Sequence, residues 1–188
     1  MTNRSPWIHQ LNHDRERKVL NEDLAIDIAI IGAGIAGIST AFFLLKNTDK
    51  KIALIEGDKL AHGATGHNAG YMASYFERPF REIVQEFGLD MACQGQRDLD
   101  SAWELCEEMY TDALLDIHFA RFESYAGLST LEQLLGHLEN DFLRRKGGLL
   151  TKPTLVWEDW PELAQIPEKY QKQIVLGSRE EIALKLET

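Results

Sequence analysis

Three glycines with the spacing Gly-X-Gly-X-X-Gly have the clearest chemical use in this sequence: Gly32, Gly34 and Gly37. At the start of a helix, this spacing presents backbone N–H groups to the phosphates of a dinucleotide. We expect Gly32 to turn the chain, Gly34 to let the backbone approach a pyrophosphate, and Gly37 to let the helix pack on a strand. Ile35 and Ala36 lie between these glycines and belong to the same predicted site.

The segments around the glycines have the order that such a site requires. An apolar run, 28–31, precedes them as a predicted strand, and a second run, 52–55, ends at Glu56. A carboxylate in this position accepts hydrogen bonds from the ribose hydroxyls and repels a 2'-phosphate, which favours FAD or NAD over NADP. The alternative is a glycine-rich turn in an ordinary parallel sheet with a solvated glutamate, but the complete order of strand, turn, helix, strand and acid favours the dinucleotide site.

A second loop of small residues follows between Ala61 and Gly70, where only two histidines and an asparagine are bulky. A backbone without large side chains can run close to a flat ligand, and an isoalloxazine with its ribityl chain would fit. An NAD-linked dehydrogenase is disfavoured, because its domain would continue here with a helix and a third strand. The candidate cofactor-binding residues of this loop are Gly63, Ala64, Thr65, Gly66, His67, Asn68 and Ala69.

Helices and short strands are expected in the rest of the chain. Apolar spacing predicts helices over 80–87, from 90 to about 114, and from 131 to about 146, and strands over 118–123 and 154–157. Two capping boxes predict helix starts. They pair Ser129 with Glu132 and Ser178 with Glu181.

Composition and charge limit the classes of protein to which this chain can belong. The 188 residues are 44% hydrophobic, enough for one core or one core plus part of another. No apolar run is long enough to cross a bilayer, and the N-terminal residues lack the pattern of a secretory signal. The net charge of -10 disfavours a nucleic-acid partner. The two cysteines are expected on one helix, too far apart to form a disulfide bond. A reducing, cytoplasmic location is therefore expected. No metal site is predicted.

With both glycine-rich loops and the acid identified, residues 27–75 resemble the FAD-binding segment of the D-amino-acid-oxidase-like superfamily. Members share the glycine triplet, the acid that ends the second strand, and a Gly-Ala-Ser/Thr-Gly-Arg-Asn-Ala/Gly-Gly run that matches residues 63–70. The motifs are most similar to those of gamma-glutamylputrescine oxidoreductases, with some similarity to dimethylglycine and sarcosine dehydrogenases.

The resemblance implies an FAD enzyme that oxidises a C–N bond of a small amine or amino acid by hydride transfer to flavin N5. The implied fold is α/β, or α+β overall: a Rossmann-like FAD-binding βαβ unit, then helices, then the beginning of an antiparallel substrate domain. We accordingly predict a polar N-terminal arm over 1–25, an FAD-binding portion over 26–115 and an incomplete substrate-domain portion over 116–188.

The sequence departs from the family pattern at His67, where the most similar members have arginine. In dimethylglycine and sarcosine dehydrogenases a histidine in the matching place bonds covalently to the flavin, so His67 is a candidate attachment site. The alternative is a histidine that donates a hydrogen bond, which is favoured because Gly66 replaces the tryptophan that precedes the linking histidine in those enzymes. No catalytic residue is assigned; His62 and His67 are either bases or solvated side chains.

Length is the second departure, because complete members are about twice as long. We therefore expect a truncated chain, a gene fragment or one subunit of a split enzyme, with a second subunit or a missing C-terminal half completing the fold. The alternative function is a noncatalytic or split-enzyme FAD-binding module that needs a second chain.

Overall fold

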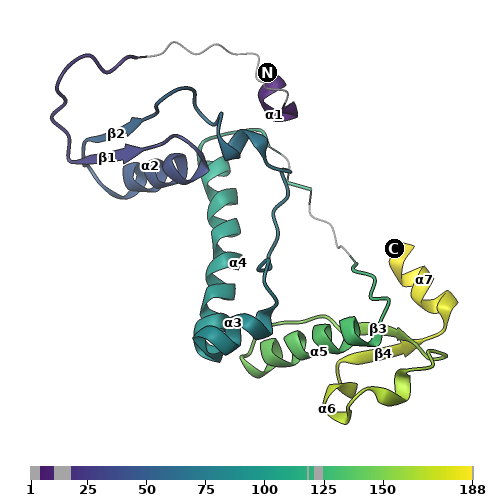
Figure 1. The fold of residues 1–188 in the computed structure, drawn as a ribbon. Coiled ribbons are helices and arrows are strands. Elements are labelled where there is room, and N and C mark those ends of the chain that lie inside the picture. The colour runs from purple at the N-terminus through teal and green to yellow at the C-terminus, as the bar shows by residue number, and fades with distance from the viewer. Residues whose placement is uncertain (1–4, 11–17, 118, 121–124, 188) are drawn as a thin grey trace. The chain divides into compact units, whose positions relative to one another are not determined.

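The computed structural model describes residues 5–10, 18–117, 119–120 and 125–187 (Figure 1). The chain forms two compact units. The first unit comprises residues 1–73 and 103–117, and the second comprises residues 74–102 and 118–188. Helix α4 (Leu89–Asp112) contributes its beginning to the second unit and its end to the first.

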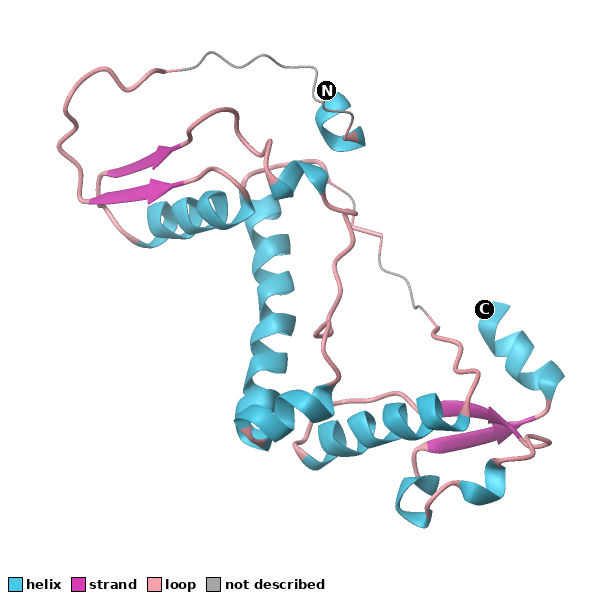
Figure 2. Cartoon of the chain, viewed as in Figure 1, coloured by secondary structure: helices cyan, strands magenta, loops and turns pink. Residues whose placement is uncertain are grey.

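A βαβ element forms the centre of the first unit (Figure 2). Strand β1 (Ile28–Ile31) and strand β2 (Ile52–Ile55) pair in parallel, with Ile28 opposite Ile52 and Ile31 opposite Ile55. Helix α2 (Ile35–Asn47) connects them and packs against both strands. The predicted strands and the helix after the glycine turn are confirmed.

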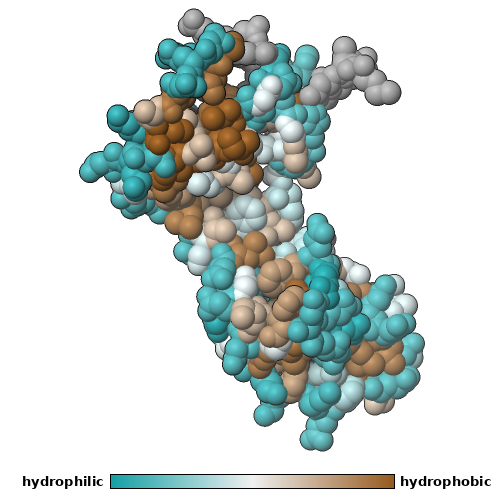
Figure 3. All heavy atoms as spheres, turned by 60° about the vertical axis from the view of Figure 1, so that its left-hand side comes forward, coloured by the Kyte–Doolittle hydropathy of each residue, from teal (hydrophilic) through white to brown (hydrophobic). Residues whose placement is uncertain are grey.

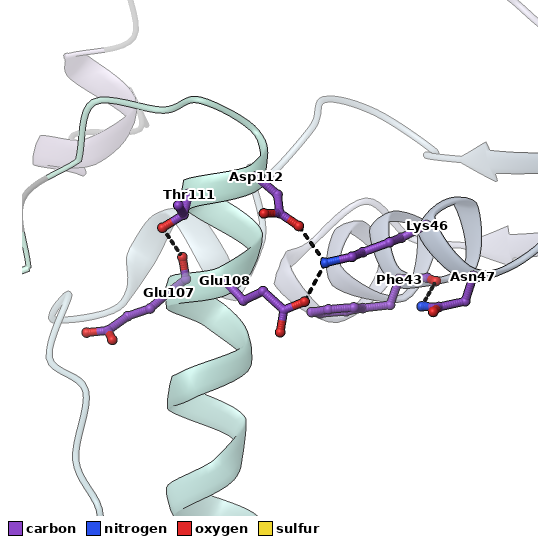
Figure 4. A network of polar contacts seen from close by, with 7 residues as sticks. All are labelled: Phe43, Lys46, Asn47, Glu107, Glu108, Thr111 and Asp112. Atoms are coloured by element: carbon purple, nitrogen blue, oxygen red, sulfur yellow. Dashed lines mark hydrogen bonds and ion pairs between the residues drawn. The ribbon is translucent and has the colours of Figure 1, made fainter.

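An ion-pair network joins the end of α4 to α2 (Figure 4). The Lys46 Nζ atom lies 2.5 Å from Glu108 Oε1 and 2.5 Å from Asp112 Oδ2. These contacts raise the pKa of Lys46 above its usual value, the hydrogen bond to Asp112 contributing most and that to Glu108 next. The Trp103 indole N–H also donates to the Ala73 carbonyl at 3.1 Å, which holds α4 against the chain that follows the second loop.

The second unit has two small apolar cores. Helix α3 (Phe80–Phe87), the beginning of α4 and helix α5 (Leu131–Lys146) enclose the first core, in which Phe80, Ala92 and Cys93 are buried. The second core lies between α5, strand β3 (Thr154–Trp157) and helix α6 (Glu168–Gln171). Its buried members are Leu134, Leu138, Val156, Ile166 and Tyr170.

Most predicted elements of this unit are confirmed. Helix α3 ends at Gly88, whose φ of 83° is in the left-handed region, and both cysteines lie on α4 as free thiols. The last helix, α7 (Arg179–Glu187), begins with the predicted capping box. The Ser178 N–H donates to Glu181 Oε2 at 2.9 Å, and the Glu181 N–H donates to Ser178 Oγ at 3.2 Å.

The predicted cap of α5 is wrong by one residue. Thr130 is the N-cap, and its hydroxyl accepts from the Gln133 N–H at 3.2 Å. Gln133 reaches back to the Ser129 N–H at 2.9 Å. Since Thr130 and Gln133 fit the capping-box pattern as well as Ser129 and Glu132 do, the pattern alone does not distinguish the two registers.

Strand pairing in the second unit also corrects the sequence prediction. Strand β4 (Ile174–Gly177), which was not predicted, pairs in parallel with β3, whereas an antiparallel substrate domain was expected. The chain between them returns through a short helix η2 (Leu163–Gln165) and α6, and such a crossover leads to a parallel neighbour. The strand predicted over 118–123 falls mostly outside the described residues.

The compact units group the chain by packing, and the predicted portions 1–25, 26–115 and 116–188 stay a prediction. Residues 5–10 belong with the βαβ element, and residues 74–102 belong with the second unit. Within the part of the chain that the structure describes, no helix is both long and apolar enough to span a membrane.

Candidate cofactor-binding site

The candidate site lies at the carboxyl ends of β1 and β2. Because Ile31 is opposite Ile55, the next residues, Gly32 and Glu56, emerge at the same edge of the sheet. The Gly32 N–H donates to the Ile55 carbonyl at 2.7 Å, which extends the pairing into the turn. In open parallel sheets, ligands bind outside this edge.

The glycine triplet is under tight steric constraint. Gly32 has a φ of 95°, a conformation that favours glycine. A Cβ atom on Gly37 would lie 1.9 Å from the Gly32 carbonyl oxygen, so only glycine lets α2 begin this close to the turn. A Cβ atom on Gly34 would lie 3.0 Å from Thr65 Oγ1. The Gly37 Cβ atom would also lie 3.3 Å from Cδ1 of Leu54 on β2, so the helix packs closely on that strand at Gly37, as predicted.

Ile35 and Ala36, the other predicted residues of this turn, form the exposed first turn of α2. The Ala36 carbonyl accepts from the hydroxyls of Ser39 and Thr40, at 3.1 and 2.7 Å. Only three residues separate the end of β1 from the start of α2, so the first turn of the helix lies at the edge of the sheet that holds the candidate site.

Glu56 holds the glycine turn through its carboxylate. Its Oε2 atom accepts from the Ala33 N–H at 2.8 Å, and Oε1 accepts from the Asp58 N–H at 3.1 Å. These backbone hydrogen bonds, that of Ala33 first, lower the pKa of Glu56 below its usual value. The group is therefore an anion at neutral pH, and each oxygen can accept a further hydrogen bond.

The second loop is tied to the first at two points. The Ala61 N–H donates to the carbonyl of Ala33, a fully buried residue, at 3.0 Å. The Ile35 N–H donates to Thr65 Oγ1 at 2.9 Å. The structure thus brings together the two glycine-rich loops, which are separated in the sequence by a helix and a strand. The Thr65 hydroxyl keeps its own proton, which it can donate to a ligand.

Side chains of the second loop order its backbone. Gly63 precedes the short helix η1 (Ala64–His67), and the His67 Nδ1 atom lies 2.8 Å from the Gly63 carbonyl oxygen. Because a carbonyl only accepts, Nδ1 carries a proton. Asn68 donates to the Thr65 carbonyl at 2.6 Å and accepts from the Gly70 N–H at 2.7 Å. Ala69 follows Asn68 on the exposed surface.

An N-terminal segment that sequence reasoning missed lies against this loop. Ser5 precedes the short helix α1 (Pro6–His9), and its hydroxyl donates to the Gly66 carbonyl. The Trp7 indole N–H donates to the Asn68 carbonyl at 2.7 Å. The available signal was the proline at the first helical position followed by the apolar pair Trp7 and Ile8, which is unusual in an otherwise polar arm.

The described side chains offer no site for a metal. No group of three or more histidine, cysteine, aspartate or glutamate residues in the described ranges is arranged to hold an ion. His62 instead makes a contact within its own loop, where its Nδ1 atom lies 2.9 Å from the Leu60 carbonyl oxygen.

Comparisons with known proteins show the family of the chain. The family model described as "FAD dependent oxidoreductase" (DAO) matches residues 27–186. The chain is 29% identical over 73 residues to "Gamma-glutamylputrescine oxidoreductase" of Escherichia coli, covering 39% of this chain and 17% of that protein. It is 36% identical over 73 residues to "Putative Rieske 2Fe-2S iron-sulfur protein YhfW" of Bacillus subtilis, covering 39% of this chain and 14% of that protein.

A third relative is "Probable oxidoreductase OrdL" of Haemophilus influenzae, 32% identical over 89 residues, covering 47% of this chain and 20% of that protein. The matched segments therefore span at most a fifth of these three relatives. No solved structure matches the chain. Since the family model extends over most of the sequence, the chain belongs to the DAO family of FAD-dependent oxidoreductases.

Proposed function

We propose that this chain binds FAD and takes part in the oxidation of a C–N bond of a small amine or amino acid. The observation that carries the proposal is the interlock of the two glycine-rich loops with the Glu56 carboxylate at the end of the parallel strands. Family membership supports the flavin chemistry. The amine specificity rests on the printed name of one relative, a gamma-glutamylputrescine oxidoreductase.

The residues present fit FAD. The first-turn amides of α2 and the Thr65 hydroxyl would hold the pyrophosphate, because Thr65 accepts from the Ile35 N–H and can pass a hydrogen bond outward. The ionised Glu56 would accept from the adenosine ribose. Residues 63–69 would lie along the ribityl and flavin portion. FAD, when bound, would accept a hydride from the carbon next to the substrate nitrogen.

A second function is favoured by the exposed apolar surface of the first unit. Among the described strands its sheet has only two members, and sheets of two strands are marginal by themselves. Ile31 is 78% exposed and Leu45 is 63% exposed. Figure 3 shows hydrophobic side chains at the surface where β1, β2 and α2 lie. A noncatalytic or split-enzyme FAD module would use this surface to bind a second chain.

Anaerobic addition of amines separates the two functions. If the chain is the enzyme, the yellow holoprotein migrates as a stable species in size-exclusion chromatography and loses its flavin absorbance when a primary or secondary amine is added. A second-chain module would instead stay colourless or aggregate by itself, and would gain flavin only with its partner. A soluble, flavin-free chain that no partner loads would contradict both functions.

Gly34→Val should reduce FAD occupancy by at least about tenfold, because a branched side chain would fill the space that the pyrophosphate needs. Even the Cβ atom would lie only 3.0 Å from Thr65 Oγ1. The ratio of flavin to protein absorbance measures the loss. Gly127→Val is the matched control, since no atom lies within 4 Å of a Cβ at that position. Unchanged occupancy in Gly34→Val with normal circular dichroism would count against the phosphate site.

Glu56→Gln should weaken FAD binding and destabilise the unliganded chain, because an amide cannot accept from the backbone N–H groups of both Ala33 and Asp58. The folded pKa of Glu56 is lowered, so its stabilising effect is complete above the ordinary pKa of 4.5 and is lost as pH falls through the folded value. Urea unfolding should show an equal difference from wild type at pH 6 and 7 and a shrinking one below 4.5. A difference that grows in acid would contradict this role.

His67 has two competing roles in this proposal, as a hydrogen-bonding residue and as a covalent attachment site. Its bond to the Gly63 carbonyl supports the first role. We therefore expect acid precipitation of the yellow protein to leave a non-fluorescent pellet and a fluorescent supernatant. A pellet that fluoresces in wild type but not in His67→Ala would establish the covalent link instead.

A further inference from the structure

The second glycine-rich loop is covered on one side by the N-terminal segment of the same chain. Residues 5–10 contact residues 64–70 through two side-chain hydrogen bonds, from Ser5 to the Gly66 carbonyl and from Trp7 to the Asn68 carbonyl. Both bonds join residues 61 positions apart in the sequence. Both also lie within the first compact unit.

Two glycines of the loop are matched to this segment. A Cβ atom on Gly70 would lie 2.7 Å from Cζ2 of Trp7, which is closer than real contacts allow. A Cβ atom on Gly66 would lie 2.8 Å from Cδ1 of Ile8 and 2.4 Å from the Ala61 carbonyl oxygen. Part of the small-residue character of this loop is therefore required by the N-terminal segment. At Gly70, the flat group that lies against the backbone is the Trp7 indole.

The two hydrogen bonds also fix the orientation of peptide groups in the loop. In a trans peptide the C=O and N–H groups point in opposite directions. Because the Asn68 carbonyl points to Trp7, the N–H of Ala69 points away from the segment. The Gly66 carbonyl, which accepts from Ser5, likewise directs the next N–H to the opposite side. The segment thus orients the backbone N–H of Ala69, a residue that the proposed function assigns to the cofactor.

A path of contacts leads from this segment to the phosphate end of the site. Trp7 donates to the Asn68 backbone, and the Asn68 side chain donates to the Thr65 carbonyl at 2.6 Å. The hydroxyl of Thr65 accepts from the Ile35 N–H in the first turn of α2. Displacing Trp7 therefore removes a restraint from Asn68. The Asn68 side chain in turn orders Thr65, whose hydroxyl contacts the first residue of α2.

We propose that residues 5–10 form a clasp that holds the second loop in its cofactor-retaining conformation and slows the release of flavin. The docking of the clasp stands on the contacts above, whereas its effect on release rests on the proposed function. Trp7 is then a positioning residue, which acts on the cofactor through Asn68 and Gly70.

The test uses the full chain loaded with FAD and diluted into buffer, with flavin release followed by the recovery of free FAD fluorescence. Trp7→Ala should speed release about tenfold, because it removes both the hydrogen bond and the ring on Gly70. Trp7→Phe keeps a ring but no N–H donor, so it should restore part of the retention. The matched control is Trp157→Ala, since Trp157 is 42% exposed, close to the 44% of Trp7, and belongs to the other unit.

Hydrogen exchange of the flavin-free chain tests docking independently. Amides of residues 63–70 should exchange faster in Trp7→Ala than in wild type, and at the wild-type rate in Trp157→Ala. Equal release rates in wild type and Trp7→Ala would overturn the retention role and leave the proposed function intact. Failure of wild type to take up FAD, both alone and with a partner chain, would overturn the proposed function together with that role. Unchanged exchange in Trp7→Ala would overturn the docking.

Discussion

The hydrogen bond from the Ala33 N–H to the Glu56 carboxylate is the interaction on which the first unit depends. It joins Ala33, in the turn after β1, to Glu56, the residue that directly follows β2. The carbonyl of Ala33 accepts a hydrogen bond from the Ala61 N–H. One buried residue therefore links the glycine turn, the end of the second strand and the second loop. Since buried backbone groups need partners, a displacement of any of these segments leaves a polar group of Ala33 unpaired. The glycine turn, the acid and the second loop therefore form one structural element.

Much of this element could be predicted because its determinants are local. Apolar runs of four residues gave β1 and β2, and the glycine spacing placed the start of α2. The strand register then brought Glu56 beside the turn without further information. Local patterns failed where two registers satisfy them equally, as at Thr130 and Ser129 before α5.

The remaining features depend on partners distant in sequence. The pairing of β3 with β4 requires a crossover, and no sequence pattern between Pro161 and Pro167 predicts it. The N-terminal segment finds its partner 61 residues away. Glycines in the second loop indicate that something lies close to the backbone, but they do not identify it. At Gly70 the neighbour is Trp7.

The ion pairs of Lys46 have an electrostatic role beyond that of ordinary surface ion pairs. The last turn of α4 contains no basic residue, yet Glu108 and Asp112 lie near its C-terminal end, where the helix macrodipole disfavours negative charge. Lys46 lies in the last turn of α2, whose macrodipole favours a cation. One ammonium group thus compensates the carbonyl ends of two helices. Acetylation of this lysine would leave both ends uncompensated and set two carboxylates against the terminus of α2.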